Sequence, residues 1–318
     1  MLMLNLIVSD LKVDALSYLR YSITLDSTLY NTFHIDRMYV NFKGDIFKTD
    51  VFKLSFRFTP DIGQIRDVGK AGRYKEGKDS TIEVPKSSIV GAYYVFSKYA
   101  FLEATYRNYK LYFGQTYNFW IRTMDRIWDY RFIEKTSNDY FSVISSADLG
   151  IAFEYSSKLF RLNLGVFNGE GYNKVEDNKF KDFEAVLSIY PINNEDLEIG
   201  IHGYGHFGKY KNEEDKIRGI GAISINQKYF RLGVEYSQFK GSTLTSGDTI
   251  SSNLISGFVV IKPINMLELF ARFDRYKEQD NFILGGFVLK LVKDFRLSLN
   301  YKQLKETGTL NLQTEVKF

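Results

Sequence analysis

The chain lacks several features that would place it in the commoner classes of protein. It contains no cysteine, which excludes disulfides, thiolate metal sites and cysteine nucleophiles. No stretch approaches the ~18–20 consecutive apolar residues that a membrane-spanning helix needs. Histidine occurs only at positions 34, 202 and 206, which excludes a histidine-rich metal site. Neither a disulfide scaffold nor a helical membrane protein fits this composition.

The chain does contain an unusual combination of aromatic and charged residues. Aromatic side chains make up 16% of the sequence, with 27 Phe and 23 Tyr, while 25% of the residues are charged. The formal net charge of +4 is too small to indicate a nucleic-acid partner. Two classes remain: a soluble all-β protein, or a protein that crosses a membrane as strands.

Apolar and polar residues alternate along most of the chain, and most regularly after residue 147. The alternating segments are about ten residues long, and the polar connections between them are alternately short and long. One such segment has on one face Leu149, Ile151 and Phe153. Counting the segments gives about five strands before residue 117 and about eleven after residue 147. The sequence therefore predicts an all-β fold, a transmembrane antiparallel β-barrel of about 16 strands.

A soluble β-sandwich is the alternative, but three observations argue against it. A sandwich has no reason to alternate short and long connections. All four prolines fall at expected strand ends or in loops, so no ladder donor is lost: Pro60, Pro85, Pro191 and Pro263. Aromatic residues mark the ends of the apolar faces, as in interfacial girdles, among them Phe230, Phe273 and Phe282. The leucines expected to face lipid are Leu162, Leu164, Leu232, Leu267, Leu269, Leu297 and Leu299.

We divide the chain into an N-terminal segment, residues 1–13, and the barrel, residues 14–318. The first segment is interpreted as the remnant of a signal peptide, or alternatively as a strand-like start of the mature chain. An even number of strands places both termini in the periplasm, and the short turns then lie on the same side. A long polar loop is expected from residue 61 to about residue 83.

Several short segments resemble the phosphate-selective porin O and P family. They are residues 37–44 (RMYVNFKG), 109–115 (YKLYFGQ), 147–150 (ADLG) and 165–171 (GVFNGEG), together with the terminal Phe318, which resembles the aromatic signature read by the barrel assembly machinery. The resemblance spans nearly the whole chain after residue 15. It implies a sixteen-stranded homotrimeric porin in which constriction arginines and lysines bind phosphate or polyphosphate.

The segment 117–146 is expected to fold into the lumen and to narrow it. It contains both tryptophans and a dense set of charges, of which the basic members are Arg122, Arg126, Arg131 and Lys135. If this piece is helical, Arg122 and Arg126 share one face. They then form a guanidinium cluster for phosphate-like anions. The alternative is that these arginines pair with Asp125 and Asp129 and only rigidify the loop.

Charged residues on the lumen-facing parity of the strands are distributed unevenly. The early strands carry basic residues, namely Arg20, Arg37, Lys53 and Arg57. Later strands carry acids, namely Asp148, Glu154, Glu184, Glu198 and Glu235. A basic wall opposite an acidic wall would set a field across the pore. The alternative is ordinary solvated charge on a water-facing wall.

These patterns predict an outer-membrane porin for passive diffusion of small solutes, with a modest preference for anions such as phosphate. The expected partners are outer-membrane lipid, small anionic solutes and two further copies of the chain, and no nucleic acid. The alternative function is a structural or scaffold barrel whose pore is plugged or occupied by a partner. Three scattered histidines and no nucleophile elbow argue against an enzyme, and we expect no cofactor. His202 and His206 share one strand face, but a metal site lacks a third ligand nearby.

Overall fold

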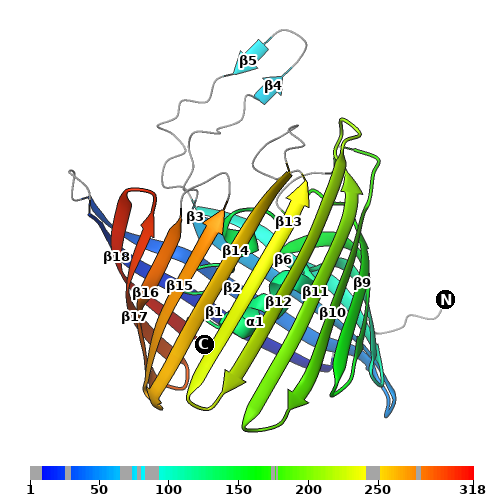
Figure 1. The fold of residues 1–318 in the computed structure, drawn as a ribbon. Helices are drawn as coiled ribbons and strands as arrows, with labels where there is room; N and C mark the ends of the chain where they lie inside the picture. Colours follow the sequence, from blue (N-terminus) through cyan, green and yellow to red (C-terminus); the bar gives the residue numbers. More distant parts are fainter. Residues whose placement is uncertain are drawn as a thin grey trace, which may run out of the picture.

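The protein is a closed antiparallel β-barrel of sixteen strands, as the sequence predicts (Figure 1). The computed structural model describes residues 9–25, 30–64, 74–76, 80–82, 93–172, 176, 178–240, 251–276 and 281–318. The order of strands around the barrel follows the sequence from β6 to β18, and β1 closes the ring against β18. Two short strands, β4 and β5, form a separate two-stranded sheet.

Five barrel strands precede the infolded segment and eleven follow it, as the sequence predicts. The first five are β1 Ser9–Thr24, β2 Asn31–Lys48, β3 Phe52–Gln64, β6 Tyr93–Tyr106 and β7 Tyr109–Tyr117, and the small sheet is β4 Tyr74–Glu76 and β5 Ser80–Ile82. The other eleven are β8 Ala147–Ser156, β9 Phe160–Phe167, β10 Asp182–Asn193, β11 Leu197–Lys209, β12 Asp215–Gln227, β13 Phe230–Lys240, β14 Ser251–Ile264, β15 Leu267–Tyr276, β16 Phe282–Val292, β17 Phe295–Leu304 and β18 Thr307–Lys317. Two helices lie between β7 and β8, α1 Phe119–Trp128 and α2 Ser137–Tyr140.

The barrel closes where the two ends of the chain meet. Leu16 pairs with Lys317 and Thr24 with Thr309, so β1 and β18 run antiparallel along their shared length. Because the strand number is even, the start of β1 and the end of β18 lie at one end of the barrel. The short turns at 107–108, 157–159, 194–196, 228–229, 265–266 and 293–294 lie at that same end (Figure 1).

The polar and apolar residues that alternate in the sequence face the lumen and the outer surface of the barrel, respectively. Along β15, Glu268 and Arg272 are buried in the lumen, while Leu269 between them is 43% exposed on the outer surface. The same parity places Leu164 and Leu299 outward. The predicted lipid-facing leucines therefore point away from the lumen, as an outer apolar band requires. Neither described helix is long and apolar enough to cross a membrane.

The structure corrects the expectation that prolines stand only at strand ends. Pro60 lies inside β3, which continues to Gln64, so the predicted polar loop starts later than residue 61. The ladder between β3 and β6 shifts register at Thr59/Pro60, and this irregularity accommodates a residue that has no N–H to donate. Register shifts also lie next to Pro191 and Pro263. Pro85 lies outside the described residues.

The N-terminal strand begins earlier than the expected start of the barrel at residue 14. β1 starts at Ser9, and Ser9 pairs with Asp45 on β2. Residues 1–8 lie outside the described residues. The interpretation of residues 1–13 as the remnant of a signal peptide stays a prediction.

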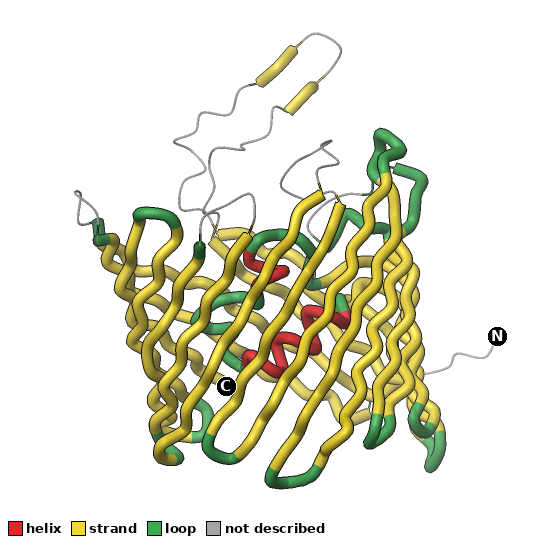
Figure 2. The backbone as a smooth tube through the Cα atoms, viewed as in Figure 1, coloured by secondary structure: helices red, strands yellow, loops and turns green. Residues whose placement is uncertain are grey.

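The segment between β7 and β8 lies inside the barrel, as predicted (Figure 2, helices in red). It covers the inner surface of β13 to β16, where several lumen-facing residues are apolar. Phe282 is one of them, and the structure corrects its assignment to the outer aromatic girdle: it is fully buried and packs against Tyr140 and Phe141 of this segment. Because the infolded loop shields this part of the wall from water, apolar side chains can face the lumen there.

Candidate functional site

The candidate site is the lumenal constriction made by residues 118–146, which we call the infolded loop. Its first helix begins at Asn118, whose side chain accepts a hydrogen bond from the backbone N–H of Ile121. The helix ends at Asp129, which adopts the left-handed conformation with φ 60°. Between these caps the apolar residues Trp120, Met124 and Trp128 are buried. The helix is thus short, capped at both ends and amphipathic.

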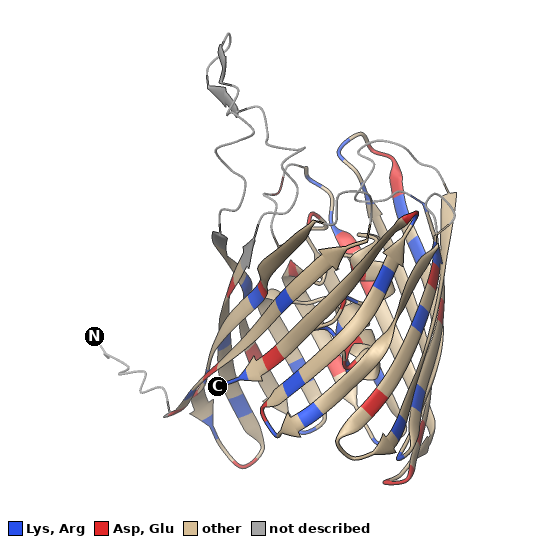
Figure 3. Cartoon of the chain, turned by 90° about the vertical axis from the view of Figure 1, so that its left-hand side faces the viewer, with Lys and Arg blue, Asp and Glu red and all other residues tan. Residues whose placement is uncertain are grey.

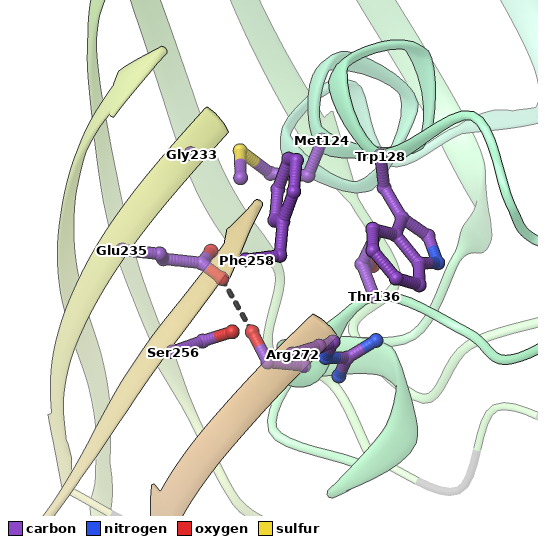
Figure 4. Close-up of a pocket in the computed structure, with 9 residues that line it drawn as sticks. Met124, Trp128, Thr136, Gly233, Glu235, Ser256, Phe258 and Arg272 are labelled. Carbon is purple, nitrogen blue, oxygen red and sulfur yellow. Dashed lines mark hydrogen bonds between the residues drawn. The ribbon is translucent and has the colours of Figure 1, made fainter. Parts of the chain in front are cut away.

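The infolded loop is held to the wall by hydrogen bonds to buried carboxylates. Glu235 on β13 accepts from the indole nitrogen of Trp120 at 2.6 Å and from the side-chain amide of Asn138 at 2.7 Å. Ser137 also donates to Glu235 (Figure 4, dashed line). Tyr130 donates to Glu268 on β15. Both helices are therefore bound to β13, and the segment between them is bound to β15.

The seam between the infolded loop and the wall is nearly filled. Figure 4 shows Met124 and Trp128 of the loop facing Phe258 and Arg272 of the wall. The cavity that remains there has a volume of about 10 Å³, room for about one water molecule. Solutes cannot pass behind the loop through a gap of this size. A route for solutes through the barrel would have to run on the other side of the loop.

Arg122 and Arg126 share one face of α1, as predicted from their spacing. Arg122 lies 3.4 Å from Glu154 on β8, and its guanidinium lies 4.4 Å from the ring centre of Tyr117. Arg126 lies 3.2 Å from Glu198 on β11. Their side chains remain 38% and 44% exposed. These arginines therefore pair with the wall and not with Asp125 or Asp129, and both side chains stay partly exposed.

Arg131 and Lys135 lie between the two helices of the infolded loop. Arg131 forms ion pairs with Asp125 at 2.8 Å and with Asp139 at 2.7 Å, while Lys135 lies 3.7 Å from Asp139. Burial by itself would raise the pKa of Asp139, but Lys135, Arg131 and Lys98 together hold it below its usual value. Pairing within the loop, the structural alternative considered above, thus applies to Arg131. Asp129 instead pairs with wall arginines, Arg231 and Arg296.

The four predicted basic residues of the early strands all face the lumen, and three of them have acidic partners. Arg20 lies 3.0 Å from Asp36, Arg37 lies 2.8 Å from Asp61, and Lys53 lies 3.8 Å from Asp45. Arg57 instead donates to the side-chain oxygen of Asn41 at 2.7 Å and to the hydroxyl of Tyr117 at 2.9 Å. The barrel carries both signs of charge along its strands (Figure 3).

Charged groups from the infolded loop and the early strands converge at one level of the lumen. The cations within electrostatic range of the Asp61 carboxylate are Arg37, Lys98, Arg131 and Lys135. Arg57 reaches the same group through Tyr99, whose ring centre lies 4.6 Å from its guanidinium and which also interacts with Arg131. Four cations therefore lie near three carboxylates, Asp61, Asp125 and Asp139, and Arg57 lies beside them on the ring of Tyr99. We call this set the eyelet.

The predicted acidic wall has a different role from the one expected. Glu154, Glu198, Glu184 and Glu235 all accept hydrogen bonds from the infolded loop, through Arg122, Arg126, Asn118 and Trp120. Asp148 accepts from the backbone N–H of Gly169. Donors from two loops therefore satisfy these acids, so they do not act as a bare negative wall facing basic strands. They position the constriction.

The two lumen-facing histidines lie in separate polar clusters. His202 lies 2.9 Å from Ser188 and 3.0 Å from Ser224, whereas His206 lies 2.7 Å from Asp182 and receives a hydrogen bond from Arg218. Among the described residues, no group of three or more potential ligands could hold a metal ion.

The sequence did not predict Asp61 and Lys98 of the eyelet, nor Tyr117 beside it. Asp61 was assigned to a loop because it follows Pro60. Lys98 was not assigned a face, since it occupies a register irregularity between Ser97 and Tyr99 that breaks the alternation. The role of Tyr117 could not be predicted from the sequence, because only the folded barrel brings Arg57 and Arg122 to its ring. Regular alternation therefore predicts which side chains of the barrel wall face the lumen, but it fails at positions where the strand register is irregular.

Comparison with solved structures identifies the class of this fold. Salmonella typhi OmpF in complex with daunomycin is similar with a TM-score of 0.71 at 10% identity, covering 97% of each chain. Vibrio cholerae OmpT is similar with a TM-score of 0.62 at 11% identity, also covering 97% of each chain. A variant of Rh. blastica porin gives 0.61 at 10% identity over 96% of this chain and 100% of the other. The chain is therefore a transmembrane β-barrel with the fold of the porins.

By sequence, no protein-family model matches the chain, and no curated protein is similar to it. The solved structures define the architecture, and the assignment of a function depends on the residues of this lumen.

Proposed function

We propose that this protein is an outer-membrane porin that allows passive diffusion of small solutes and modestly prefers anions such as phosphate. One observation carries the preference: at the eyelet four cations lie near three carboxylates, and Arg57 adds a further positive charge beside them. Lumen walls of low dielectric focus such a field, so even a small excess of positive charge raises the local concentration of anions. The porin fold and the infolded loop support the diffusion function.

The residues proposed to line the route and contact anions come from the infolded loop and the early strands. They are Arg20, Arg37, Lys53, Arg57, Arg122, Arg126, Arg131 and Lys135. Of these, Arg122, Arg126 and Lys135 have the largest exposed fractions in the loop, from 38% to 44%. An anion that sheds water at the constriction gains most from donors that are not fully used by partners. We therefore expect a preference and not a tight phosphate site, because most eyelet charges are already paired.

A homotrimer is part of the same proposal. One similar structure, that of Vibrio cholerae OmpT folded in vitro, is described as a trimer form. Membership of the phosphate-selective porin family stays a prediction from the sequence resemblance.

The experiment is conductance of the purified protein in a planar lipid bilayer. We expect open channels. In a gradient of potassium chloride, the sign of the reversal potential should show that chloride permeates more readily than potassium. A cation-preferring reversal potential would overturn the anion preference. A silent protein that is correctly folded would overturn the porin function and favour a scaffold barrel.

A further inference from the structure

A buried cation lies at the eyelet and is nearly hidden from the lumen. Lys98 on β6 has only 2% of its surface exposed. Its ammonium group donates to the hydroxyl of Ser146, and within the described part of the chain it forms no ion pair with a carboxylate. Asp61 and Asp139 lie in electrostatic range but are engaged by Arg37 and Arg131. Lys98 thus lies beside the lumen, but its side chain is not accessible from it.

An aromatic ring from an outer loop covers this ammonium group. The ring centre of Tyr172 lies 3.7 Å from the Lys98 nitrogen, at the distance of a cation–π interaction. Phe96 supports the ring from the side, with the two ring centres 5.6 Å apart. Tyr172 is only half-buried while Lys98 is fully buried, so the ring is the more exposed of the two groups. The face of the tyrosine replaces water around the ammonium.

The loop that carries Tyr172 is fixed at its base. The backbone N–H of Gly169 donates to Asp148 at 2.8 Å, and Lys216 donates to the carbonyl of Gly169 at 3.0 Å. Gly171 has a φ of +83°, and a Cβ there would lie 2.5 Å from the Ser145 hydroxyl. Only glycine allows this close approach. The loop base is therefore held against the residue that precedes Ser146, the partner of Lys98.

We propose that Lys98 is a selectivity-determining residue of the pore and that Tyr172 limits its effect by covering it. The inference rests on the proposed porin function. With the ring in place, permeating ions meet the π face and edge of a neutral tyrosine. With the ring removed, they meet the ammonium of Lys98 directly at the eyelet. The aromatic cover thus sets how strongly the pore attracts anions.

The first test compares reversal potentials of Tyr172→Ala and Tyr172→Phe with the parent. Tyr172→Ala should shift the reversal potential toward anions, because it exposes the ammonium. Tyr172→Phe is the matched control: it keeps the ring over Lys98, so its potential should equal that of the parent. In the double variant Tyr172→Ala with Lys98→Met the shift should disappear. A shift that persists without Lys98 would overturn the proposal, as would no shift in Tyr172→Ala.

A second measurement does not depend on conduction. Folded protein in detergent is treated with an amine-acetylating reagent, and modification of Lys98 is followed by peptide mass spectrometry. Tyr172→Ala should increase the rate severalfold over the parent and over Tyr172→Phe, with Lys228 in an exposed turn as the internal reference. An unchanged rate in Tyr172→Ala would overturn the masking of Lys98.

The two experiments separate this inference from the proposed function. If the parent prefers cations, the proposed anion preference fails, yet a shift toward anions in Tyr172→Ala still supports the role of Lys98. If labelling rises while the reversal potential stays unchanged, Lys98 is masked but does not determine selectivity, and the inference is wrong.

Discussion

The indole nitrogen of Trp120 donates a hydrogen bond of 2.6 Å to the carboxylate of Glu235, joining the infolded loop to the barrel wall. Both side chains are buried, and Glu235 also accepts from Ser137 and Asn138. A single wall carboxylate therefore fixes both helices of the loop. This arrangement makes the shape of the constriction depend on a residue more than a hundred positions away in the chain.

The first prediction concerns this anchor. Glu235→Ala removes the acceptor that Trp120, Ser137 and Asn138 share, and of these Asn138 also donates to Ser237. The change should destabilise the folded barrel by about 1–3 kcal/mol. It should also loosen the infolded loop, which single-channel recordings would show as added current noise. Glu235→Gln keeps one acceptor oxygen and should have a smaller effect on both. Equal noise in the parent and in Glu235→Ala would show that the loop is held by other contacts.

The second prediction concerns selectivity at the infolded loop. Changing Arg122 and Arg126 together to Glu should move the reversal potential toward cations, because both side chains are partly exposed to the lumen and now repel anions. The matched control changes Lys228 and Lys293 to Glu, the same change in charge in two exposed turns. If only variants of Arg20, Arg37 or Arg57 change the selectivity, the constriction has been placed in the wrong segment.

The third prediction concerns the lipid-facing surface. Leu269 is exposed on the outer face of β15, so Leu269→Arg should cost roughly 2–4 kcal/mol in the free energy of unfolding. Val292→Arg, at the end of β16, should cost only about 0–1 kcal/mol because the side chain reaches the interface. Urea titration of the protein folded into lipid vesicles measures both. Equal costs at the two positions would contradict the depth assignment.

The fourth prediction concerns acid and the ion pairs of the infolded loop. The pKa of Asp139 is held below its usual value, so its carboxylate stabilises the folded state above the unfolded pKa of about 3.9, and this contribution is lost as the pH falls through the folded pKa. Asp139→Asn should therefore lower the melting temperature at about pH 7. The difference from the parent should narrow only in strong acid. A difference that is already gone at about pH 5 would contradict the assigned ion pairs.

Much of this architecture could be predicted from the sequence, because alternation is a local property. The apolar parity of Leu269 and Leu299 follows from neighbouring residues alone, and the strand count follows from repeating that pattern. The infolding of residues 118–146 was also predictable, since a charged segment with both tryptophans interrupts the alternation. Arg122 and Arg126 were placed on one face by their spacing along the helix.

Only the tertiary structure decided which groups meet in the lumen. The alternation predicted that Phe282 belongs to the outer girdle. In the structure it faces the lumen, where it packs against Tyr140 of the infolded loop. The acids of the later strands suggested a bare negative wall, yet donors from loops distant in sequence satisfy them. Asp61 and Lys98 follow or occupy register irregularities, where one extra residue reverses the face of a side chain. Neighbouring residues alone determine which side chains of a strand face the lumen. The charge that a solute meets depends on contacts between distant segments, which only the closed barrel brings together.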